Sequence, residues 1–126
     1  MEWRKICKTM TTITELKEIN STLRKYNGGR AKIWAFKLTL NRIFLRINSS
    51  AKEDIVYLVA ASCEHINGPF SWNNVNISVI VEVDKETSET VSRAIDKKAE
   101  FELIASGGII LTQGSEKEFV EYFEQI

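Results

Sequence analysis

The sequence has few of the residues on which catalysis and metal binding usually depend. It holds one histidine, one proline and two cysteines among 126 residues. No Cys-x-x-Cys or His-x-x-x-His spacing occurs, so no structural zinc motif is recognisable. No glycine-rich loop has the P-loop or dinucleotide-binding form. We therefore expect neither a metal nor a cofactor.

Long apolar runs and export signals are also missing. No apolar run approaches the roughly 20 residues that a helix needs to cross a bilayer. Basic residues near the N-terminus are not followed by the apolar segment of a signal peptide. The sequence thus predicts a cytoplasmic protein that is not inserted in a membrane. In that compartment Cys7 and Cys63 are expected to be free thiols.

Neither sign of charge is in excess, but the charges are unevenly distributed. Residues 1–54 hold 12 Lys or Arg against 5 Asp or Glu, and residues 55–126 hold 5 against 12. Either the two halves complement each other on packing, or a basic and an acidic patch serve partners. An overall basic footprint for nucleic acid is absent. A minority interpretation is a smaller basic and aromatic surface for nucleic acid. It would consist of Arg30, Lys32, Trp34, Lys37 and Arg46.

Two apolar stretches organise the chain, which has the length of one domain over residues 1–126. Residues 55–63 are apolar on both parities, as in a strand that is covered on both faces. Residues 75–83 alternate strictly, as in a half-buried strand. We expect both strands in the middle of a sheet, with a loop over residues 64–74 between them.

Helices are predicted near both ends of the chain. A capping box at Thr12–Glu15 and a following apolar stripe predict a helix over residues 12–27, and residues 2–10 carry a shorter stripe. A second capping box at Ser115–Glu118 begins the C-terminal helix. Its apolar stripe consists of Phe119, Tyr122, Phe123 and Ile126.

The remaining strands are predicted as hairpins. Residues 31–48 fit a two-residue turn at Asn41-Arg42, which places Lys37 opposite Arg46. Like charges directly opposite each other destabilise a sheet. Either Glu82 or Glu102 relieves them, or the pair forms an anion site. Residues 101–105 and 109–112 flank Gly107-Gly108 and form a second hairpin, and residues 84–99 contain one or two helical turns.

These elements predict an α+β domain. A mostly antiparallel sheet of about six strands carries an N-terminal and a C-terminal helix packed against it. A cystatin-like wrap and an open roll both satisfy the pattern. A homodimer through an exposed sheet edge is compatible with it.

Catalysis through histidine would have to use His65, two residues after Cys63. A thiolate activated by an imidazole is the chemistry of cysteine hydrolases. In an extended strand, however, an i, i+2 pair holds its Cβ atoms about 6–7 Å apart. A buried cysteine and a polar histidine at the mouth of the loop is the favoured interpretation.

The loop 64–74 is the best candidate for recognition, because it combines aromatic anchors with small polar groups. The alternative is a structured turn whose aromatic side chains fold back on the sheet. The candidate binding residues are His65, Asn67, Phe70, Trp72, Asn73, Lys37 and Arg46.

Two functions of different class follow. The favoured one is a small non-enzymatic binding protein, of the immunity, inhibitor or adaptor type, that holds a protein partner through loop 64–74 and its uneven charge. The alternative is a small hydrolase or ligand-binding enzyme centred on Cys63 and His65.

Overall fold

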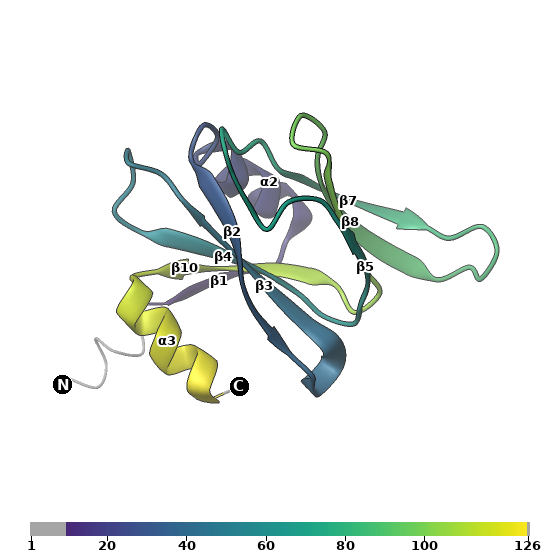
Figure 1. The fold of residues 1–126 in the computed structure, drawn as a ribbon. Helices are drawn as coiled ribbons and strands as arrows, with labels where there is room; N and C mark the ends of the chain where they lie inside the picture. Colours follow the sequence, from purple (N-terminus) through teal and green to yellow (C-terminus); the bar gives the residue numbers. More distant parts are fainter. Residues whose placement is uncertain (1–9, 126) are drawn as a thin grey trace.

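The structure is a computed structural model that describes residues 10–125. Within that range the chain forms two helices and two antiparallel sheets (Figure 1). The α+β class is therefore confirmed. The single sheet predicted from the sequence is wrong, since the strands divide into a sheet of six and a sheet of four, and a cystatin-like wrap is not shown.

The six-stranded sheet has the order β1-β10-β4-β3-β2-β6, with β1 (Thr11–Ile13), β10 (Ile109–Gly114), β4 (Ile55–Ala60), β3 (Arg42–Asn48), β2 (Arg30–Lys37) and β6 (Ser71–Asn73). The four-stranded sheet has the order β5-β9-β8-β7, with β5 (Cys63–Asn67), β9 (Phe101–Ala105), β8 (Thr90–Asp96) and β7 (Ser78–Val83). The helices are α2 (Leu16–Arg24) and α3 (Glu116–Gln125), and a 3-10 turn, η1, spans Thr39–Asn41.

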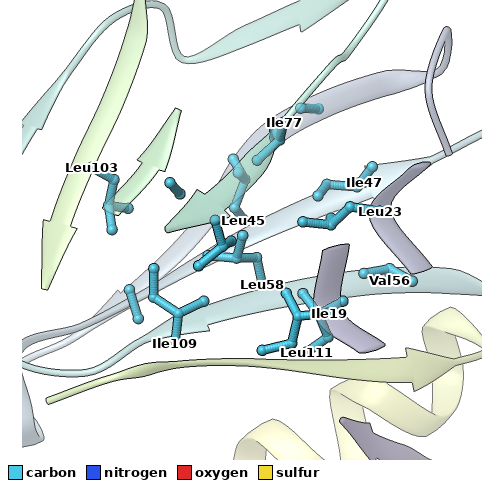
Figure 2. Packing of buried hydrophobic residues seen from close by; sticks show 14 of the residues in the cluster. Ile19, Leu23, Leu45, Ile47, Val56, Leu58, Ile77, Leu103, Ile109 and Leu111 are labelled. Carbon is cyan, nitrogen blue, oxygen red and sulfur yellow. The ribbon is translucent and has the colours of Figure 1, made fainter. Parts of the chain in front are cut away.

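The inner faces of the two sheets and helix α2 share one hydrophobic core. Leu45 and Leu58 of the six-stranded sheet and Leu103 of the four-stranded sheet are fully buried in it. Ile19 and Leu23 of α2 pack into the same cluster (Figure 2). Burial of each such side chain contributes about 1.5–3 kcal/mol, so this core is the main source of stability.

Strand β4 is central, as its sequence predicts. Val56 and Leu58 point into the shared core, whereas Tyr57 and Val59 point to the opposite face of the six-stranded sheet. Both faces of the strand are buried because α3 covers the outer one. Only the end of the predicted strand 55–63 is wrong, since the chain leaves β4 after Ala60 and crosses to the other sheet.

Helix α3 forms as predicted over Glu116–Gln125, and Ile126 of the predicted stripe lies outside the described residues. The Ser115 Oγ accepts a hydrogen bond from the Glu118 N–H at 3.2 Å, and the Glu118 carboxylate accepts one from the Ser115 N–H at 2.7 Å. Phe119 is fully buried, and its ring stacks on Tyr57 with a centroid distance of 3.5 Å. The capping box and the aromatic stripe together fix this helix to the outer face of the six-stranded sheet.

The N-terminal helix is shorter than predicted. Thr11–Ile13 pairs with β10 as a strand, so the expected capping box at Thr12–Glu15 does not form, and Glu15 caps α2 without a side-chain hydrogen bond. The apolar Ile13 explains the difference, because it is buried in the core as part of a strand. Apart from Met10, the stripe predicted over residues 2–10 lies outside the described residues.

The first hairpin has a different register from the predicted one. Phe36 is the partner of Ile43, and residues 38–41 form the turn between the strands. Leu38 and Leu40 are therefore exposed at the tip instead of paired. The observed register, with a bulge after Ile33, places Trp34 and Phe44 under α3. Hairpin pairing alone could not show that α3 would bury this face.

Two further predictions are wrong for the same reason, which is the division into two sheets. Residues 90–96 form strand β8 and not helical turns. Strands β9 and β10 belong to different sheets, so Gly107-Gly108 does not close a hairpin. Instead, the Gly107 N–H donates to the Ala61 carbonyl, in the connection where the chain crosses from β4 to β5. A Cβ at Gly107 would lie 2.8 Å from that oxygen. The β9–β10 connection can therefore pass this close to the β4–β5 connection only with glycine at position 107.

Candidate functional site

The structure does not bring the Cys63 thiol and the His65 imidazole together. A bulge separates the two residues: Cys63 pairs with Ala105 and packs against the shared core, whereas His65 pairs with Ile104 on the outer face. The Cys63 Sγ donates to the backbone oxygen of His65, at 3.6 Å, and not to the imidazole ring. Burial raises the pKa of the Cys63 thiol, which opposes formation of a nucleophilic thiolate.

The recognition residues predicted in loop 64–74 are divided between the two sheets. His65 and Asn67 belong to β5, and the His65 Nε2 lies 4.0 Å from a Glu102 carboxylate oxygen. Asn73 belongs to β6 in the other sheet and is exposed. Phe70, in the turn between these strands, is 77% exposed.

Trp72 has a structural role. Its Nε1 donates a hydrogen bond of 2.8 Å to the buried carboxylate of Asp96, and its ring packs on Phe101 with a centroid distance of 4.6 Å. The same carboxylate accepts a hydrogen bond from the Asn76 N–H at 2.8 Å. The structured-turn alternative therefore describes Trp72, while the exposed Phe70 remains available for contact.

Lys37 and Arg46 do not face each other, contrary to the predicted pairing. Lys37 lies opposite Arg42, and its Nζ donates to the backbone oxygen of Phe123 at 2.8 Å. The Arg46 Nη1 lies 3.1 Å from a Glu116 carboxylate oxygen. Both cations thus contact helix α3, on the outer face of the six-stranded sheet.

The carboxylates predicted to relieve that pair lie on the other sheet. Glu82 lies 2.9 Å from the Arg93 Nη2. The Arg93 Nε is 3.4 Å from Glu102 Oε2, but without hydrogen-bond geometry, so its buried N–H keeps no partner in the described part of the chain. With His65 beside Glu102, these side chains form a charged row across the outer face of the four-stranded sheet. The sequence does not indicate this row, because it predicts helical turns in the segment that contains Arg93.

Strand β7 forms one edge of the four-stranded sheet, which corrects the prediction that it lies in the middle. The backbone N–H of Val79 donates to the Asn20 Oδ1 at 2.8 Å, and the Val79 carbonyl accepts from the Asn20 Nδ2 at 2.8 Å. The side-chain amide of α2 thereby occupies the position that a neighbouring strand would take.

Among residues 10–125, no strand pairs with this edge of β7, and beyond Val79 we therefore call the edge open. In an antiparallel pair, alternate residues direct both backbone groups away from the partner strand. Because Val79 does so, Val81 and Val83 also direct their N–H and C=O groups away from β8. Their side chains are 47% and 61% exposed. Figure 1 shows the β7–β8 hairpin extending away from the rest of the molecule at this end.

The open end of β7 is acidic. Residues 82–89 contain four carboxylates and one lysine. A cleft of about 390 Å³ opens beside it on the outer face. Its lining consists of Glu64, Glu82, Val83, Asp84, Lys85, Val91, Arg93 and Ile104. An open row of backbone donors and acceptors therefore adjoins a cleft in which acidic side chains predominate over basic ones.

Comparison of the chain with protein-family models, curated protein sequences and solved structures gave no match. Among residues 10–125, no group of three or more His, Cys, Asp or Glu side chains is placed to hold a metal ion. No helix in the same range is long and apolar enough to cross a membrane.

Proposed function

We propose that this protein is a non-enzymatic binding protein, of the immunity, inhibitor or adaptor type, that holds a protein partner. The partner contributes an extended segment that pairs with β7 at Val81 and Val83 and so adds a strand to the four-stranded sheet. The observation that carries the proposal is the open edge itself. Most proteins block or cover such an edge, because it readily pairs with other chains.

The surroundings of the edge indicate the chemistry of the partner segment. On the inner side of the sheet, the exposed side chains of Val81 and Val83 favour apolar neighbours on the added strand. On the outer side, Glu64 and Asp84 favour Lys or Arg, whereas Glu82 already pairs with Arg93. Since side chains alternate between the two faces of a strand, the expected segment alternates apolar and basic residues.

The hydrolase alternative receives no support from the geometry. Its two candidate residues point to opposite faces of β5, and the pKa of the Cys63 thiol is raised. We therefore do not propose it.

Peptide display offers the test, with Val81→Pro as the decisive variant. Proline removes the outward N–H of residue 81 but no hydrogen bond to β8, and edge strands tolerate proline in this orientation. Val81→Thr is the matched control, because it also replaces the valine side chain, with one of nearly the same shape, but keeps the N–H. Peptides selected on the wild-type protein should alternate apolar and basic residues, bind Val81→Thr, and fail to bind Val81→Pro.

Hydrogen exchange on the wild-type protein gives a second measurement that does not depend on how the proline variant folds. A selected peptide should slow exchange of the Val81 and Val83 amides and leave that of Val79, which Asn20 already holds, unchanged. Peptides that bind Val81→Pro as tightly as wild type, or that protect neither amide, would refute the proposal.

A further inference from the structure

A second charged cleft lies on the opposite side of the molecule. It opens on the outer face of the six-stranded sheet, beside the part that α3 covers, and has a volume of about 260 Å³. Its lining consists of Arg30, Lys32, Arg46 and Asn48. Three of these four side chains are cationic and the fourth carries an amide, so no acidic residue lines the cleft.

The strand register forces two of these cations together. Lys32 is the direct cross-strand partner of Arg46, and Arg30 is that of Asn48. Like charges directly opposite each other destabilise a sheet, and an acid in place of Lys32 would be favourable. Glu116 reaches only the Nη1 of Arg46 and is itself more than half exposed. A bound anion would remove this unfavourable pairing.

Unpartnered hydrogen-bonding atoms continue the same row towards the interior. Arg46 is the cross-strand partner of Tyr57, and Tyr57 is that of Thr112. Within the described residues, the Arg46 Nε, the Tyr57 hydroxyl and the Thr112 hydroxyl are all buried without a hydrogen-bond partner. Buried polar groups are rarely left unpaired, because each costs about 1–3 kcal/mol. At the cleft, the row ends in the Arg46 Nε, a hydrogen-bond donor that a ligand in the cleft could satisfy.

We propose that this cleft binds a phosphoryl group. A phosphoryl group offers several acceptor oxygens and up to two negative charges, which suits two guanidinium groups and an ammonium group. The volume falls below the range of about 300–1,000 Å³ that holds drug-sized ligands, so it suits the phosphoryl group of a small phosphomonoester. The proposal is independent of strand addition at β7, which uses the other sheet.

The substitution Lys32→Glu separates binding from folding, because it should move the two in opposite directions. It replaces a like-charge pair with an opposite-charge pair, so the apparent Tm should rise by about 1–4 °C. It also removes a cation from the cleft, so affinity for inorganic phosphate should fall at least about tenfold. Lys97→Glu is the matched control, since it makes the same charge change at an exposed position in the turn after β8 and should leave phosphate binding unchanged.

Titrations followed by amide chemical shifts would measure these affinities, with inorganic phosphate, phenyl phosphate and a short oligothymidylate as probes. Saturable shifts centred on Lys32 and Arg46 with both small probes, lost in Lys32→Glu, would support the proposal. Three results would overturn it: no saturation by either small phosphate, equal losses in Lys32→Glu and Lys97→Glu, or binding of the oligonucleotide alone. The last result would indicate a diffuse nucleic-acid surface instead of a discrete site.

Discussion

The substitution Asn20→Ala tests how the edge of the four-stranded sheet is built. Asn20 makes two hydrogen bonds of 2.8 Å with the backbone of Val79, one as acceptor and one as donor. Alanine removes both and leaves the N–H and C=O groups of Val79 with no protein partner. The open edge would then begin at Val79 and not at Val81, so one substitution should lower stability and lengthen the binding edge.

The expected loss of stability follows from the two bonds and their exposure. A hydrogen bond contributes a net of about 0.5–1.5 kcal/mol, so two contribute about 1–3 kcal/mol. The site is only partly buried, so water can reach the freed groups and the lower half of that range applies. Alanine also favours the helix by up to about 0.7 kcal/mol, which offsets part of the loss. We expect the free energy of unfolding to fall by about 0.3–2 kcal/mol.

Urea denaturation of three variants separates these contributions. Ser21→Ala changes an exposed residue of the same helix, so it reports the gain in helix propensity alone. Asn20→Asp keeps the acceptor for the Val79 N–H but presents a second oxygen to the Val79 carbonyl, so it should be at least as destabilising as alanine at neutral pH. If Asn20→Ala matched Ser21→Ala in stability, and exchange of the Val79 amide stayed as slow as in wild type, the amide would not protect this edge.

Three further outcomes are expected elsewhere in the fold. Phe119→Ala should lower the free energy of unfolding by about 3–5 kcal/mol in urea denaturation, since the ring is fully buried; a loss below about 1 kcal/mol would mean that α3 is not firmly packed. Asp96→Asn should cost about 2–4 kcal/mol and change the fluorescence of Trp72, because an amide cannot accept all the hydrogen bonds that the buried carboxylate receives. In a Cys7→Ser background, burial raises the pKa of Cys63, so its alkylation by iodoacetamide should become fast only at a higher pH than that of N-acetylcysteine. Equal midpoints would show that the thiol is not buried.

The sequence predicted best those elements whose local pattern agrees with their final environment. Strand β4 is apolar on both parities and is buried on both faces. Helix α3 carries a capping box and an aromatic stripe, and both are used as expected. In each case the residues that specify the element also specify its packing, so no knowledge of distant segments was needed.

The errors occurred where a distant segment decides the outcome. The β2–β3 register depends on α3, which comes from the far end of the chain and packs Phe119 against Trp34 and Phe44. Strand β7 alternates as a half-buried strand should, yet it lies at an edge because α2 and not a strand meets it at Val79. Periodicity shows which face of a strand is apolar, but it does not show which strand lies beside it.

The candidate sites were anticipated as residue types but not as arrangements. The sequence predicts Lys32 and Arg46 in one basic surface, but the cleft depends on the register that places them opposite each other. The sequence indicates the role of Asn20 only weakly, through the position of this polar residue beside Ile19 on the buried side of an amphipathic helix. A polar residue in that position generally has a buried partner, and here the partner is a sheet edge.

The two proposed surfaces account for the uneven charge of a chain whose net charge is zero. The basic cleft is built on β2 and β3, from the basic half of the sequence, and the acidic edge on β7 and β8, from the acidic half. They lie on different sheets with the shared core between them, so the charges of the cleft and of the edge do not pair with each other, although Arg46 of the cleft pairs with Glu116 from the acidic half. Charges separated by more than about 8–10 Å of solvent are largely screened at physiological salt. A cationic peptide segment at the edge and a phosphoryl group in the cleft could therefore bind at the same time, with each ligand leaving the affinity of the other nearly unchanged.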